Sequence, residues 1–133
     1  MKKFISLFIG LFIFYACAED DELSYKYEFL KIDEYNVPAS FKLGEIDSIT
    51  VKYTLFGGCY QFNDLYYEYQ DTARVVAITS VVFLDQPCTK ELIKREHKFA
   101  VKATQKEDYL FRFWKGKDAN DKNIFDDVVI PVN

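Results

Sequence analysis

His97 is the residue on which most catalytic machinery in this chain would depend, because it is the only histidine. A Ser-His-Asp triad needs a histidine base, and the sequence has no Gly-x-Ser-x-Gly elbow to present a serine. Catalytic zinc sites usually take two or three histidine ligands. His97 also alternates in phase with Phe99, which predicts a partly buried structural histidine. We therefore expect no catalytic residue, no metal site and no cofactor.

Paired carboxylates are the chemistry that the sequence leaves open. Glycosidase-type catalysis depends on the distance between two carboxyl groups, and the fold sets that distance. Only generic candidates are present, and they are Asp64, Glu68, Asp126 and Asp127. The polar segment 116–123 (GKDANDKN) lacks the spacing and the final bidentate acid of an EF-hand calcium loop. Its Gly, Asp and Asn residues predict a hairpin turn instead.

A basic head and an apolar run occupy the first sixteen residues. Lys2 and Lys3 precede the apolar segment 4–15, which is interrupted only by Ser6 and Gly10. This pattern is typical of a secretory signal. A membrane-spanning helix needs about 20 apolar residues, so the run is too short for that alternative. We expect residues 1–16 to be removed and to take no part in the fold.

The end of the apolar run offers two processing sites. Residues 14–17 (FYAC) resemble the lipobox of bacterial lipoproteins, with Ala16 as the small residue before the cut, although the two residues before Ala16 are bulkier than is usual. The resemblance implies that Cys17 is acylated and anchors the protein. Ordinary signal peptidase would instead read 16–18 (ACA) and cleave before Glu19. We favour the lipobox, since cysteines rarely fall at this position by chance.

Four acidic residues follow Cys17 within the segment 18–22 (AEDDE). A block of like charges stays solvated, which predicts a flexible tether over residues 17–24. The acidic run resembles the export signal of surface lipoproteins in one large group of Gram-negative bacteria. That resemblance implies an outer-membrane location with the domain facing outward. A periplasmic or secreted location is the alternative.

Cys59 and Cys88 remain once Cys17 carries lipid. An even pair of cysteines in an exported protein is most simply a disulfide. The bridge would span 29 residues, counted as 88 less 59, and the chain-entropy model gives it roughly 3–4 kcal/mol of stabilisation. Neither cysteine has a neighbouring histidine or cysteine, which makes a metal site or a reactive thiol the weaker interpretation.

The mature chain would hold 117 residues, enough for one domain with its own core. Its 17 basic residues less Lys2 and Lys3 leave 15 against 21 acidic ones, a net charge of −6. Nucleic-acid binding requires clustered Lys and Arg, so this balance argues against it. The basic residues of the segment 90–98 are mixed with Glu91 and Glu96, which indicates a solvated face.

Alternating and β-branched segments predict about seven strands in a domain over residues 25–133. The expected strands are 25–32, 46–56, 65–70, 74–84, 97–103, 109–115 and 124–132. Residues 91–96 could form a short helical turn. Period two places Ile49, Val51, Tyr53 and Leu55 on one face of their strand, and 74–84 is apolar on both faces.

The order of these segments resembles an immunoglobulin-like antiparallel β-sandwich. Residues 108–111 (DYLF) are similar to the tyrosine corner, in which a tyrosine at the start of the penultimate strand bonds back to backbone. Phe111 stands where antibody domains have a cysteine, and Cys59 and Cys88 are too close in sequence for the antibody bridge. The resemblance is therefore to bacterial immunoglobulin-like modules, and with the leader it extends to small Gram-negative lipoproteins. It implies a fold and an anchor but no activity.

Aromatic residues are in excess, and two places could present them to a ligand. Tyr66 and Tyr67 are adjacent in a strand, so one of them should point outward. Trp114 shares a strand face with Arg112 and Leu110, opposite the face that holds Tyr109, Phe111 and Phe113. If that face is the outer one, it is a platform for a sugar or a partner protein. The simpler interpretation is Arg112 packed on Trp114 by a cation–π contact.

These observations predict a membrane-anchored, surface-exposed lipoprotein that acts as a non-catalytic binding or structural module. The partner would be a glycan or a protein, and the lipid would join the protein to the membrane. The alternative is a periplasmic enzyme or enzyme inhibitor with the same anchor.

Overall fold

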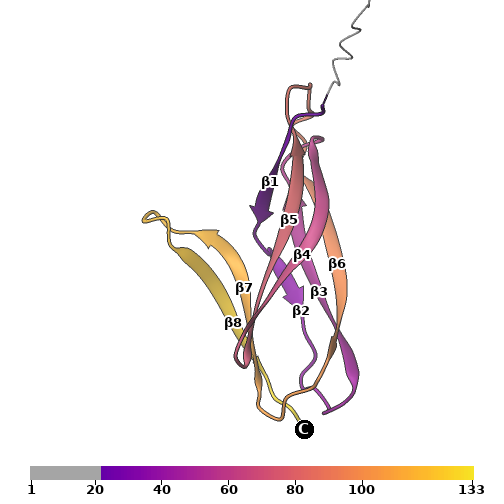
Figure 1. Cartoon of the computed structure of the whole chain (residues 1–133), viewed down its shortest axis with the longest axis vertical. Helices are drawn as coiled ribbons and strands as arrows, with labels where there is room; N and C mark the ends of the chain where they lie inside the picture. Colours follow the sequence, from indigo (N-terminus) through magenta and orange to yellow (C-terminus); the bar gives the residue numbers. More distant parts are fainter. Residues whose placement is uncertain (1–21) are drawn as a thin grey trace, which may run out of the picture.

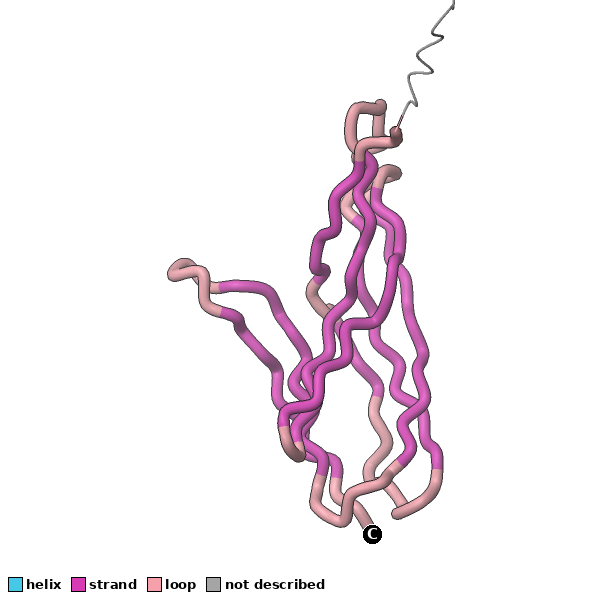
Figure 2. Tube along the Cα trace, in the orientation of Figure 1, coloured by secondary structure: helices cyan, strands magenta, loops and turns pink. Residues whose placement is uncertain are grey.

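The computed structural model describes residues 22–133, so the predicted signal peptide, Cys17 and most of the acidic tether lie outside the described residues. In the described range the chain forms eight strands and no helix, and hence no helix able to cross a membrane. The strands form one open sheet of five strands and one of three, packed as a sandwich (Figure 1, Figure 2). The predicted all-β sandwich is confirmed.

The larger sheet is organised around one central strand, β5 (Ala73–Phe83), which pairs with three others. The other members of the sheet are β1 (Tyr25–Leu30), β4 (Tyr60–Gln70), β7 (Tyr109–Lys117) and β8 (Asn123–Ile130). β4 pairs along one edge of β5. β1 and β7 share the other edge, where β1 pairs with residues 78–83 and β7 with residues 73–76. β8 then pairs with β7 as a hairpin.

The smaller sheet contains β2 (Glu34–Asn36), β3 (Ile46–Leu55) and β6 (Ile93–Lys102), in that spatial order. β2 was not predicted, because three residues are too short for a periodic pattern. The expected helical turn over 91–96 is wrong. Ile93 already pairs with Leu55 of β3, and the ten-residue ladder that follows makes this segment a strand.

The sandwich is not purely antiparallel, which corrects the predicted fold class. β5 and β7 run parallel through four residue pairs, from Ala73–Leu110 to Val76–Phe113. After β5 the chain crosses to the other sheet, forms β6 there and returns as β7. Two crossings bring β7 back in the direction of β5, and parallel neighbours require such a crossover.

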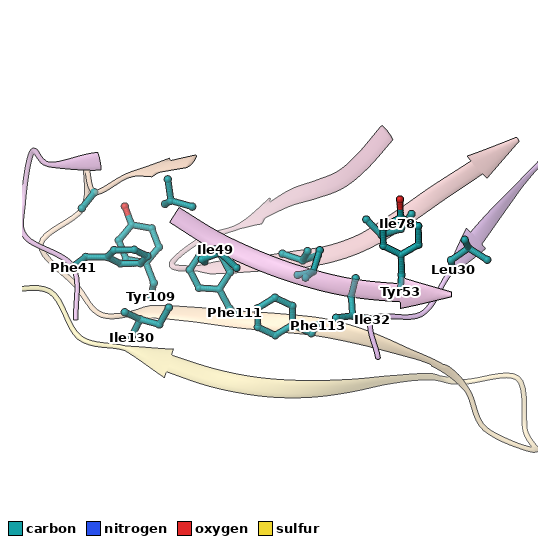
Figure 3. Close-up of a cluster of buried hydrophobic side chains, with 14 of the residues drawn as sticks. Leu30, Ile32, Phe41, Ile49, Tyr53, Ile78, Tyr109, Phe111, Phe113 and Ile130 are labelled. Carbon is teal, nitrogen blue, oxygen red and sulfur yellow. The ribbon is translucent and has the colours of Figure 1, made fainter. Parts of the chain in front are cut away.

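The core lies between the two sheets and follows the predicted alternation (Figure 3). Ile49, Val51, Tyr53 and Leu55 of β3 are all buried, as are Phe111 and Phe113 of β7. The buried cluster also includes Leu30, Ile32, Phe41, Val76, Ile78, Val101, Ala103, Tyr109 and Ile130. Each fully buried aliphatic or aromatic side chain contributes about 1.5–3 kcal/mol relative to an exposed one.

Tyr109 makes the backbone contact that the predicted tyrosine corner requires. Its hydroxyl accepts hydrogen bonds from the backbone N–H of Thr104 at 3.0 Å and of Gln105 at 3.4 Å. Arg74 packs nearby, with its guanidinium 5.1 Å from the Tyr109 ring. Arg74 also donates to the Gln105 side chain and to the Asp71 backbone carbonyl. These contacts join the loop before β7 to the turn before β5.

The disulfide between Cys59 and Cys88 is present, as predicted, with the two Cα atoms 5.4 Å apart. It joins the residue before β4 to the loop after β5. The backbone N–H of Gly58 donates to the Thr89 carbonyl beside the bridge. The Leu84 N–H donates to the carbonyl of Ser24 at the same end, so the disulfide lies at the end of the sandwich where the described chain begins (Figure 1).

Candidate functional site

The outer face of the five-stranded sheet is unusually aromatic. Tyr25, Tyr27 and Phe29 alternate along β1 and pair with outward-facing residues of β5, and their side chains are 53%, 62% and 50% exposed. Tyr66 reaches the same face from β4, since it pairs with Ala77 of β5. Trp114 of β7, its cross-strand partner Phe125 of β8, and Phe83 of β5 opposite Tyr25 lie on this face as well. All five strands of the sheet therefore supply aromatic rings to one surface.

Four of these rings surround a groove with a volume of about 340 Å³, in which Phe29, Tyr66, Trp114 and Phe125 are the aromatic walls. Val75 and Ala77 of the central strand β5 also line it, and both are buried although they lie on the outer face. Polar groups complete the lining, and they are Glu68, Gln70, Lys117 and Asn123. Binding sites for small ligands commonly combine such apolar walls with a few polar groups.

Phe29 connects the two sides of the groove. Its ring centroid lies 5.3 Å from that of Tyr66 and 5.9 Å from that of Trp114, both in edge-on geometry. Edge-to-face contacts of this kind are favourable and fix the rings relative to one another. The walls are therefore already held in place by contacts within the protein.

Hydrogen bonds orient two of the rings. The Tyr66 hydroxyl donates to Glu68 Oε2 at 2.8 Å, and this bond to the carboxylate is the main reason why the pKa of Tyr66 is raised. The Trp114 indole N–H donates to Asn123 Oδ1 at 3.1 Å. A carboxylate has about four acceptor sites and an amide has two N–H donors. Glu68 and Asn123 thus keep capacity to bind a ligand.

The β7–β8 hairpin forms one wall, and it projects away from the rest of the sandwich (Figure 1). Arg112 holds its two strands together by an ion pair of 3.0 Å with Asp127 and by its guanidinium, which lies 4.3 Å from the Phe125 ring centroid. Two residues before the end of β7, the Lys115 ammonium donates to the backbone carbonyls of Ile32 and Asp33. These contacts anchor the hairpin where the chain passes between the sheets.

The structure separates the three predicted platform residues. Trp114 lines the groove, and Arg112 reaches it only through Phe125, on which the guanidinium packs in place of the expected Trp114. Leu110 lies near the start of β7, beside Ala73, and is not part of the lining. Of the adjacent tyrosines, Tyr66 points outward and Tyr67 packs against the core.

Sequence reasoning missed Phe29 and Phe125 as members of this site. The alternation of Tyr25, Tyr27 and Phe29 was a usable signal, because three aromatic residues at period two must share a strand face. No comparable signal marked Phe125. Its place in the groove follows from the β7–β8 register, which sets it opposite Trp114.

The candidate carboxylates are engaged in structural contacts. Glu68 accepts from Tyr66, Asp126 accepts from the Tyr35 hydroxyl at 2.8 Å, and Asp127 pairs with Arg112. Asp64 accepts from the N–H of Leu65, the next residue. Within residues 22–133 no group of three or more His, Cys, Asp or Glu side chains is arranged to hold a metal ion.

His97 has an aromatic environment. Its imidazole stacks on the Phe62 ring with centroids 4.8 Å apart, and it lies 6.5 Å from Phe99. The side chain is half-buried, in agreement with the predicted structural role.

Comparisons with known proteins identify no relative of this chain: no family model, no curated protein and no solved structure matches it.

Proposed function

We propose that this protein is a lipid-anchored, non-catalytic module that binds a neutral glycan in the groove between β1 and the β7–β8 hairpin. The observation that carries the proposal is the set of four aromatic walls with a carboxylate and two amides in the same lining. The anchor is inferred from the leader and Cys17, and the outward-facing location from the acidic run that follows.

The lining matches the chemistry of a hexopyranose. A sugar ring has C–H faces that pack on aromatic rings, and hydroxyl edges that need hydrogen-bonding groups. Phe29, Trp114 and Phe125 offer the apolar surface. Glu68 can accept hydrogen bonds from hydroxyls, whereas Gln70 and Asn123 can both donate and accept.

The charge balance favours a neutral glycan over an anionic one. The chain without its leader carries a net charge of −6, and Glu68 adds an acid to the groove itself. The ammonium of Lys117 is paired with Asp121 at 3.3 Å. A polyanionic sugar would therefore meet repulsion that a neutral one avoids.

The single tryptophan of the sequence provides a direct test, because Trp114 lies in the groove. The protein from its native membrane, in a detergent without a sugar headgroup, is titrated with maltohexaose, cellohexaose, mannohexaose and xylohexaose. We expect a saturable change in tryptophan emission with at least one of them. No saturable change with any of the four, together with no heat in calorimetry, would refute glycan binding.

A matched pair of acid substitutions tests whether the groove is responsible. Glu68→Gln keeps the shape of the lining but removes the charged acceptor, and should weaken binding by about tenfold or more, since hydrogen bonds to charged groups are the stronger ones. Glu107→Gln changes an exposed acid outside the groove and should bind as the unmodified protein does. Equal loss in both variants would contradict the assignment.

Intact mass tests the anchor separately. Protein from the native membrane should have the mass of residues 17–133 plus acyl chains, less two hydrogens for the disulfide. Protease treatment of whole cells should then digest it if the domain faces outward. A mass for residues 19–133 without lipid would eliminate the anchor and leave the groove proposal standing.

We also propose that the sandwich is a divergent immunoglobulin-like module. The Tyr109 contact with the backbone of Thr104 and the final β7–β8 hairpin support this relation. An experimental structure that aligns with immunoglobulin-like domains strand for strand would test it, and a different strand connectivity would reject it.

A further inference from the structure

We infer that the glycan is an extended chain, which continues from the groove along Tyr27 and Tyr25 of β1. The inference rests on the proposed function, because it concerns the length and path of the ligand of that same groove. It changes the expected ligand from a terminal sugar to an internal stretch of an oligosaccharide.

The aromatic strip on β1 continues the groove without interruption. Phe29 is both a wall of the groove and the last residue of the strip. Alternate residues of a strand lie about 6.6–6.8 Å apart, so Tyr27 and Tyr25 extend the surface by about 13–14 Å beyond Phe29. A surface of that length is long enough for successive sugar units to lie along it.

The strip is exposed although it is aromatic. Tyr27 is 62% exposed and Tyr25 is 53% exposed, and their rings contact each other edge-on with centroids 5.6 Å apart. Contiguous exposed aromatic surface of this kind usually marks a binding site. The outward β5 residues beside the strip, Val81 and Phe83, are only half-buried and widen the same surface.

The charges of β1 are turned away from the strip. Lys26 and Glu28 point to the opposite face of the strand and pair with each other at 3.4 Å. The polar groups of the strip itself are the hydroxyls of Tyr25 and Tyr27. A surface of aromatic rings and neutral hydroxyls complements a neutral, hydroxyl-rich chain, and it continues the chemistry of the groove.

Chain length is the property to measure. The titrations use cellobiose against cellohexaose, maltose against maltohexaose, and mannobiose against mannohexaose. We expect the hexasaccharide of the recognised sugar to bind at least about tenfold more tightly than its disaccharide, because each added ring contact contributes a few-fold. Equal affinity for the two lengths would overturn the inference and leave the groove proposal intact.

Substitutions at Tyr27 locate the path of the chain. Tyr27→Ala should weaken hexasaccharide binding by about three- to tenfold and leave disaccharide binding unchanged. Tyr27→Phe keeps the ring and should retain most of the affinity. Ile46→Ala is a matched control, because Ile46 is 68% exposed but lies on β3 in the other sheet. An unchanged hexasaccharide affinity in Tyr27→Ala would overturn the inference.

Sedimentation of the same variants addresses a competing occupant. A second copy of the protein on the strip would give a concentration-dependent dimer that Tyr27→Ala abolishes, and this result would overturn the inference. A monomer with length-dependent binding supports it. If neither length of any sugar binds, the failure lies with the proposed function itself.

Discussion

At the scale of single residues, two side chains near the start of β7, Tyr109 and Arg74, make polar contacts in addition to packing. Burial raises the pKa of Tyr109, but the hydrogen bonds from Thr104 and Gln105 to its hydroxyl, together with the nearby Arg74 guanidinium, outweigh burial and lower it. The same hydroxyl holds the loop before β7 in place through Thr104. Beside it, Arg74 is buried, and its Nε atom has no hydrogen-bond partner within the described residues. This end of the sandwich therefore depends on a small number of polar contacts.

Replacing Tyr109 by Phe should test the tyrosine corner directly. The change removes the acceptor of the Thr104 N–H and keeps the ring in the core, and we expect it to reduce the free energy of unfolding by about 1–2 kcal/mol. Urea denaturation followed by circular dichroism measures the loss. Tyr27→Phe is the control, since that hydroxyl lies on the exposed strip, and a similar loss there would contradict the explanation.

Tyr67 should make stability fall at high pH. Burial against the core raises its pKa from 10.0 to about 12, although the nearby Arg74 guanidinium lowers it in part. A raised pKa in the folded state means that the contribution is fully present below about pH 10 and is lost as the pH rises toward 12. Urea midpoints measured across this range should decline less steeply in Tyr67→Phe. Parallel declines in the two proteins would count against this cause.

At the scale of elements, the turn between β3 and β4 is tightly constrained. Gly57 adopts φ +151°, and a Cβ atom added there would lie 2.6 Å from the Thr89 carbonyl oxygen. The Tyr60 N–H also donates back to the Gly57 carbonyl. The disulfide follows two residues later, so the turn, the bridge and the loop after β5 pack as one unit at this end of the sandwich.

Gly57→Ala should therefore destabilise the fold more than Gly44→Ala. Both glycines have positive φ, but nothing lies within 4 Å of a Cβ added at Gly44. Conformational strain should cost each variant about 1 kcal/mol, and the steric conflict with Thr89 should add about 1–3 kcal/mol at Gly57. Chemical denaturation of the two variants gives the difference. Equal losses would show that the close approach to Thr89 is relaxed at little cost.

At the scale of the molecule, the described disulfide constrains two neighbouring strands of the larger sheet and does not link one sheet to the other. The Cys59–Cys88 bridge connects the residue before β4 to the loop after β5, and β4 and β5 pair as a hairpin. The aromatic groove lies further along the same sheet and is built from β1, β4, β5, β7 and β8. The bridge therefore stabilises the scaffold of the groove and contributes no side chain to its lining.

Replacing both cysteines by serine should lower the free energy of unfolding by about 3–4 kcal/mol, because the unfolded chain gains the entropy of an open 29-residue loop. The native fold and the glycan titration should persist at low temperature. The unmodified protein under reducing conditions should match the variant in urea denaturation. A much smaller loss than in the reduced protein would mean that serine introduces a compensating contact.

Local patterns in the sequence determined most of the strands and the core faces, but they missed β2 and the first part of β6. Alternation at period two decides which residues share a face, whatever the partner strand is, and this is why Ile49, Val51 and Tyr53 were placed correctly. The disulfide was also predictable, since two cysteines remained once Cys17 was assigned to the lipid. These predictions needed no knowledge of how the strands pair.

The tertiary structure alone decided the groove and the parallel pairing of β5 with β7. Phe29, Tyr66 and Trp114 are far apart in the sequence, and they meet only because β4 pairs with one edge of β5 while β1 and β7 share the other. Strand order and register are set by long-range packing between segments, and a periodic pattern carries no information about which edge a strand will occupy. The aromatic excess was visible in the sequence, but its assembly into one surface depends on these edges.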